Sequence, residues 1–173
     1  MEKPFWWLPE RIIQPSFLSF SGALPPGFRV PLMSSVIAFR GAAALSEFRT
    51  QRLLERLKTA WPAITGIESE HLYLVECATP LDAAESSRLN AVLEATDTAV
   101  DVAGAFIVAP RLGTISPWSS KATDILRHCG LSNVVRVERV TRFMPVAGKK
   151  NPSAAERGAL ATLLHDRMIE TVL

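Results

Sequence analysis

One stretch of the chain, residues 110–124, concentrates side chains that could bind an anion. It follows a short apolar run at 105–109 and precedes a helical pattern that Gly130 closes, so the expected order is strand, loop and helix. Free N–H groups and the macrodipole at a helix start favour phosphate or carboxylate. The candidate ligand or interface residues are Arg111, Thr114, Ser116, Trp118, Ser119, Ser120, Lys121 and Thr123.

The same stretch has a second interpretation. Ser119 or Ser120 would cap a helix expected over about 120–129, while Pro117 and Trp118 pack the turn. The alternatives are therefore a phosphate-ligand-binding module built on the helix start at 119–123, or a capped helix with a structural or docking role.

Catalytic and metal-binding patterns are not found elsewhere in the sequence. Cys77 and Cys129 lie far apart without a CxxC partner, which predicts two reduced, buried thiols. Cys129 and its neighbour His128 cannot form a nucleophile–base pair, since adjacent residues on a helix point about 100° apart. His71 lies alone in an expected strand. We therefore predict no catalytic residue, no metal site and no cofactor in this chain.

Composition limits the partners of the chain. It has 173 residues, 48% of them hydrophobic, and a formal net charge of +2, which suits one domain or two small halves sharing a core. No polybasic tract suggests a nucleic acid or membrane partner. No apolar run reaches the roughly twenty residues of a membrane helix, and the N-terminus lacks the order of a signal peptide. We expect a cytoplasmic protein.

Residues 1–32 hold half of the prolines together with scattered aromatic residues. Proline removes backbone donors and blocks helix interiors, so this segment is predicted to be an irregular arm, disordered or absent in vivo, with Met33 as an alternative start. The folded part is expected to span 33–173.

Hydrophobic periodicity predicts strands over 34–40, 70–77, 105–109 and 134–146, the last of them half-exposed, with Gly41 ending the first. Helices are expected over 45–60, from Asp82 to about 95, over 120–129, and from Ser153 onward, where Asp82 with Glu85 and Ser153 with Glu156 have capping-box spacing. The predicted buried faces of these helices are Leu45, Phe48, Leu53, Leu54 and Leu57; Leu89, Val92 and Leu93; Ile125, Leu126 and Cys129; and Leu160, Leu163, Leu164 and Met168.

The order strand, helix, strand, helix occurs twice, which predicts an α+β fold made of two pseudo-repeated halves, about 33–98 and 99–173. Each half is too small to bury a good core alone, so the halves should share their sheets and core.

Several segments resemble one family, in order along the chain: 40–49, 110–125, 129–131, 136–139 and 164–172. The family is phosphoribosylformylglycinamidine synthase, also called formylglycinamide ribonucleotide amidotransferase. The similarity is to the N-terminal region of its large single-chain bacterial form and covers residues 33–173.

This resemblance implies a ligase of purine biosynthesis in which glutamine supplies ammonia and ATP, with Mg²⁺, activates the substrate. The family's N-terminal region looks like a duplicated and fused small subunit of the split enzyme, which bridges the other parts. The implied partners are the linker, synthase and glutaminase parts of the enzyme. The chain alone is expected to be inactive, to expose apolar surface, and to dock the 110–124 stretch onto the synthase.

Overall fold

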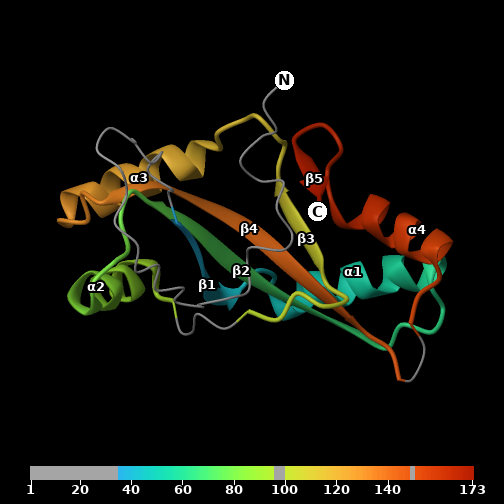
Figure 1. Ribbon diagram of the computed structural model, residues 1–173. Coiled ribbons are helices and arrows are strands. Elements are labelled where there is room, and N and C mark those ends of the chain that lie inside the picture. The colour runs from blue at the N-terminus through green and yellow to red at the C-terminus, as the bar shows by residue number, and fades with distance from the viewer. Residues whose placement is uncertain (1–34, 96–99, 149–150) are drawn as a thin grey trace, which may run out of the picture.

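The computed structural model describes residues 35–95, 100–148 and 151–173, which form an α+β fold (Figure 1). Residues 1–32, predicted to be an irregular arm, and Met33, the predicted alternative start, lie outside these ranges. The elements in chain order are β1 (Ser35–Ala43), α1 (Glu47–Ala60), β2 (Gly66–Cys77), α2 (Ala83–Leu93), β3 (Phe106–Pro110), α3 (Pro117–His128), β4 (Val134–Val146), α4 (Ala154–Leu164) and β5 (Glu170–Val172).

All five strands form one antiparallel sheet in the order β1-β2-β4-β3-β5. The two longest strands, β2 and β4, pair along their whole length in the middle, with Leu72 opposite Val140. The half-exposed strand that the alternating sequence predicts is observed in part: Val135, Arg139 and Val146 of β4 are exposed, but the face that carries its charged residues is buried at its centre. Its charged residues Glu138 and Arg142 are only 3% and 7% exposed.

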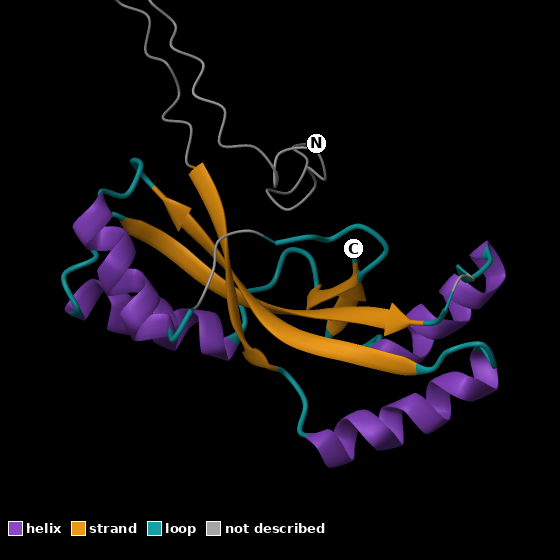
Figure 2. Cartoon of the chain, turned by 90° about the horizontal axis from the view of Figure 1, so that it is seen from below, coloured by secondary structure: helices purple, strands orange, loops and turns teal. Residues whose placement is uncertain are grey.

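The helices pack on one face of the sheet in two pairs, one at each end (Figure 2). One core joins α1 and α4 to the sheet, through Leu57 and Leu160 against Phe143. The other core joins α2 and α3, through Leu89 and Leu126. Each helix of the first half of the chain therefore shares a core with a helix of the second half.

The opposite face of the sheet carries a smaller apolar cluster with charged residues beside it. Leu72, Ala109 and Val140 are buried there. The carboxylate of Glu70 accepts from both Arg40, at 2.7 Å, and Arg142, at 2.9 Å. No helix among the described residues is long and apolar enough to cross a membrane.

The predicted starts of α2 and α4 and the predicted ends of α1 and α3 are confirmed. Both capping boxes form, with Asp82 and Ser153 accepting from the third residue of α2 and α4. Trp61 caps the end of α1. Gly130 follows α3 with φ +81°, a conformation that glycine adopts without strain.

Several predicted burials are wrong. Phe48 is 70% exposed, with the Arg52 guanidinium 5.8 Å from its ring centre, because α1 buries only Leu54 and Leu57. On α3, Ile125 is 55% exposed and Cys129 is also exposed, because polar side chains of that helix face the sheet. Met168 is 77% exposed, because α4 ends four residues earlier at Leu164.

Two features of the sheet differ from expectation. Gly41 does not end β1: the strand continues to Ala43 with an irregularity after Arg40. A Cβ atom on Gly41 would lie 2.6 Å from the ring of Tyr73, so glycine makes room for that ring. Strand β5 was not predicted, since three residues carry no period; its pairing with β3 defines it.

The shared core of α1 and α4 gives a stability test. Leu57 is fully buried, so Leu57→Ala should lower the free energy of unfolding by about 2–5 kcal/mol in urea titrations. The matched control on the same helix is Phe48→Ala, which should cost below about 1 kcal/mol because the ring is exposed. Equal losses for the two variants would contradict this division of α1.

Candidate functional site

The start of α3 lies three residues earlier than predicted. The helix begins at Pro117, whose ring is favourable in the first turn, and Ser116 is its cap. The Ser116 hydroxyl accepts from the Ser119 N–H at 3.0 Å. The prediction that Ser119 or Ser120 caps the helix is therefore wrong, because Pro117 supplies a fixed φ that starts the helix directly after Ser116.

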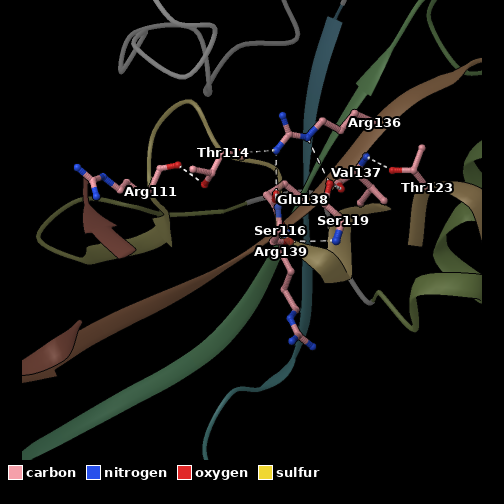
Figure 3. Close-up of polar contacts among 9 residues, drawn as sticks. All are labelled: Arg111, Thr114, Ser116, Ser119, Thr123, Arg136, Val137, Glu138 and Arg139. Atoms are coloured by element: carbon pink, nitrogen blue, oxygen red, sulfur yellow. Dashed lines mark hydrogen bonds and ion pairs between the residues drawn. The ribbon is translucent and has the colours of Figure 1, made fainter. Parts of the chain in front are cut away.

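Ser119 and Thr123 point inward and join α3 to β4 (Figure 3). The Ser119 hydroxyl donates to the Val137 carbonyl at 2.6 Å, and the Val137 N–H donates to the Thr123 hydroxyl at 3.1 Å. Strand β3 pairs with β4 only as far as Thr141 and ends at Pro110. Beyond the last residue of β4 that pairs with β3, side chains of α3 therefore form hydrogen bonds with the backbone of β4.

The contact continues toward the end of α3. Arg127 donates to the Val135 carbonyl at 2.9 Å. Ser116, Ser119, Thr123 and Arg127 are spaced by three or four residues, which places them on one face of the helix. This polar face explains why Ile125 and Cys129, predicted to be buried, face outward.

A carboxylate of the chain itself lies at the start of α3. Glu138 of β4 accepts from the Ser116 hydroxyl at 2.7 Å and from the Ser116 N–H at 3.4 Å. Arg136 donates to the same carboxylate at 2.9 Å. The favourable place for a negative charge at a helix N-terminus is therefore taken by a buried glutamate.

The remaining polar candidates divide into two groups. Thr114 donates its hydroxyl hydrogen to the Arg111 carbonyl at 2.6 Å, within the loop itself. Arg111, Ser120 and Lys121 are exposed, and no side-chain hydrogen bond or ion pair joins them to another described residue. The structure brings Ser116, Ser119 and Thr123 together as structural groups and leaves the other three facing solvent.

Trp118 belongs to a stack of three side chains. Its ring lies 5.7 Å from that of Tyr73 at an interplanar angle of 13°. The guanidinium of Arg139, which lies opposite Tyr73 in the sheet, is 5.0 Å from the Trp118 ring centre. We call these residues the Trp118 stack. Sequence reasoning selected Trp118 but not its partners, because only strand register brings Tyr73 and Arg139 to it.

His71 and the cysteines show no catalytic arrangement. Burial, and then the positive charge of Arg139, hold the pKa of His71 below its usual value. Burial raises the pKa of Cys77 to about 11, and Cys77 is the reduced, buried thiol predicted. Cys129 is exposed, which corrects its predicted burial. Among the described residues, no three His, Cys, Asp or Glu side chains gather around a common point where a metal ion could bind.

Large apolar side chains are exposed on two segments of the chain that contact each other, the loop before α3 and the segment that contains β5. The two segments are joined by a hydrogen bond from the Arg111 N–H to the Ile169 carbonyl at 2.9 Å. We call the following residues the Ile115 patch, with their exposed fractions: Leu112 37%, Ile115 63%, Met168 77%, Ile169 64% and Leu173 49%.

Two hollows are found among the described residues, and only the first adjoins the Ile115 patch. The first, beside Leu112 and Leu173 of the Ile115 patch, has a volume of about 10 Å³, which is no larger than a water site. The second, of about 280 Å³, lies between the end of β4 and the start of α4 and is lined by Trp61, Met144 and Arg157 among others. Arg157 is already used there, donating to the carbonyls of Gly104 and Ala105.

The fold and the site define an α+β domain. Ser116, Ser119 and Thr123 at the start of α3 form hydrogen bonds within the domain, and the residues of the Ile115 patch are exposed. A family model described as formylglycinamide ribonucleotide amidotransferase N-terminal matches residues 70–173, well over half of the chain. The chain therefore belongs to this family, and it is part of a multi-domain or multi-subunit enzyme of the purine pathway.

The link between α3 and β4 can be tested with two adjacent serines. Ser119→Ala leaves the buried Val137 carbonyl without its donor and should lower the free energy of unfolding by about 1–3 kcal/mol. Ser120→Ala, on the exposed side of the same turn, should stay within about 0.5 kcal/mol. Urea titration measures both.

A second readout tests the acceptor side of this link. Thr123→Val keeps the shape of the side chain and removes the acceptor for the Val137 N–H, so hydrogen exchange at Val137 should become faster. Unchanged exchange at Val137, together with equal losses for the two serine variants, would contradict the role of α3 described above.

Proposed function

We propose that this chain is an assembly domain of formylglycinamide ribonucleotide amidotransferase, inactive alone, that docks against other parts of the enzyme. The observation that carries the proposal is the contrast between the polar and the apolar residues at the start of α3. Ser116, Ser119 and Thr123 bond within the chain, while the adjacent Ile115 patch exposes five large apolar side chains.

The Ile115 patch supports docking because clustered apolar side chains on a surface are typical of protein–protein contact. The family match provides the source of the partner, since the matched region is the N-terminal part of a larger enzyme. The partners we propose are its linker, synthase and glutaminase parts. Holding the glutaminase against the synthase would keep ammonia from being lost during the reaction.

We assign the chemistry of the enzyme to those other parts. The reaction joins the amide nitrogen of glutamine to formylglycinamide ribonucleotide with ATP and Mg²⁺, in the cytoplasm. The described residues offer no carboxylate cluster for Mg²⁺, so we derive no step of the reaction from this chain.

We also propose that the domain arose by duplication of a strand-helix-strand-helix unit. In the order β1-β2-β4-β3, the second half mirrors the first about the β2–β4 pair. Both α2 and α4 begin with a capping box and bury two leucines four residues apart. These correspondences support an origin like a fused pair of small subunits.

A phosphate site at 119–123 predicts a measurable effect of inorganic phosphate. Because Glu138 already occupies the start of α3, we expect phosphate in large excess to leave the thermal midpoint of the chain unchanged, and Lys121→Ala to behave like wild type. Calorimetric scans at constant ionic strength measure this. A rise in the midpoint with phosphate, lost in Lys121→Ala, would favour the phosphate-binding module.

The docking role predicts binding between this chain and the remaining parts of the amidotransferase, produced as a separate protein whose folding circular dichroism verifies. Ile115→Ser with Met168→Ser should weaken binding at least tenfold in titration calorimetry, because two anchors of the Ile115 patch are lost. The matched control is Phe48→Ser, an equally exposed apolar residue on α1, and it should bind like wild type.

Three results would count against this proposal. Absence of binding by the wild-type chain would refute the assembly role. Equal binding by the double variant would refute the Ile115 patch as the docking surface. Turnover by the isolated chain in a ligase assay with glutamine and ATP would refute its inactivity.

A further inference from the structure

Three arginines of β4 have different surroundings. Arg136 is paired with Glu138, and Arg142 is paired with Glu70. Arg139 lies between them in the sequence, and within the described ranges its guanidinium has an aromatic contact but neither an ion pair nor a hydrogen bond. Figure 3 shows the Arg139 guanidinium pointing away from Arg136 and Glu138. The guanidinium of Arg139 is therefore available to a partner.

The side chain of Arg139 is both exposed and held in place. Its guanidinium lies over the Trp118 ring, which in turn stacks on Tyr73. The absence of a side chain at Gly41 leaves space for the Tyr73 ring. An arginine fixed on an aromatic surface keeps its fork of N–H donors oriented, and such a fork matches the two oxygens of a carboxylate.

The neighbouring groups favour an acidic partner. The polar residues of β2 and β4 that share this face near the Trp118 stack are Ser69, His71 and Thr141, none of them acidic. The carboxylate of Glu138, which accepts from the Arg139 N–H at 3.0 Å, is already paired with the Arg136 guanidinium. Trp118 adds an indole N–H for which the described residues provide no acceptor. Tryptophan, tyrosine and arginine are also the residues that most often dominate the energy of protein interfaces.

We propose that the Trp118 stack is a receptor for an aspartate or glutamate side chain from another part of the amidotransferase, bound by the Arg139 guanidinium. This inference rests on the proposed assembly function and names the chemistry of one contact within it. It adds a polar anchor to the apolar contact of the Ile115 patch, in which Ile115 lies three residues before Trp118.

His71 provides a reporter inside the chain. Its Nδ1 atom is buried and has no hydrogen-bond partner among the residues that the structure describes, and Arg139 contributes to the lowering of its pKa. A carboxylate on Arg139 would offset that positive charge, so the pKa of His71 should rise on binding. A purely apolar contact elsewhere on the domain would leave it unchanged.

The experiment uses the full chain and the remaining parts of the amidotransferase. Arg139→Gln should weaken binding at least tenfold in titration calorimetry, and Arg139→Lys should fall between it and wild type, because lysine keeps the charge but lacks the fork. The matched control is Arg52→Gln, since Arg52 is also an exposed arginine over an aromatic ring, Phe48. It should bind like wild type.

NMR titration of the His71 ring, free and bound, is the second measurement. The pKa should rise on binding in the wild-type chain and stay unchanged in Arg139→Gln. Wild-type binding without a rise would overturn the inference, as would undiminished binding of Arg139→Gln, and both outcomes would leave the assembly function standing. No binding by the wild-type chain would refute the assembly function itself. The wild-type titration needs no variant, so a folding defect cannot obscure the result.

Discussion

The hydrogen bonds between α3 and Val137 organise this end of the molecule. Strand β4 is longer than β3, so part of its backbone has no neighbouring strand on that side. A buried backbone group without a partner is costly. The Ser119 hydroxyl donates to the C=O of Val137, and the Thr123 hydroxyl accepts from its N–H. These two hydrogen bonds hold α3 against the strand. The orientation of α3 then decides which of its side chains face inward, and which surround the Trp118 stack.

Local signals in the sequence were sufficient for most of the fold. The capping boxes at Asp82 and Ser153, the stop at Trp61 and the glycine after α3 each act within one turn, so they could be read without tertiary information. The predictions of burial were wrong where a contact with a distant part of the chain decides which side of a helix faces the sheet. Ile125 and Cys129 look apolar enough for a core, but α3 turns its polar side to the sheet because the unpaired edge of β4 requires donors and acceptors.

The candidate site shows the same limit. The hydroxyls of Ser116, Ser119 and Thr123 predict an anion at a helix start, and a carboxylate does lie there, but it belongs to Glu138 of the same chain. Residues that bind a ligand and residues that bind a neighbouring strand have the same chemistry. The position of Glu138 depends on the register of β4 against β2, which no local pattern in the 110–124 stretch reports.

The geometry of α3 explains how one turn can serve both structure and contact. Successive residues on a helix point in different directions, so fixing Ser116, Ser119 and Thr123 on β4 turns Ser120 and Lys121 to solvent and directs Trp118 toward Tyr73. The same bonds fix the end of the loop, because Ser116 is bonded to Glu138 of β4, and Ile115 directly before it is 63% exposed. Within four residues the chain thus passes from an exposed apolar side chain, through a cap bonded to β4, to the Trp118 stack, so the bonds that fix α3 also fix the position of the stack.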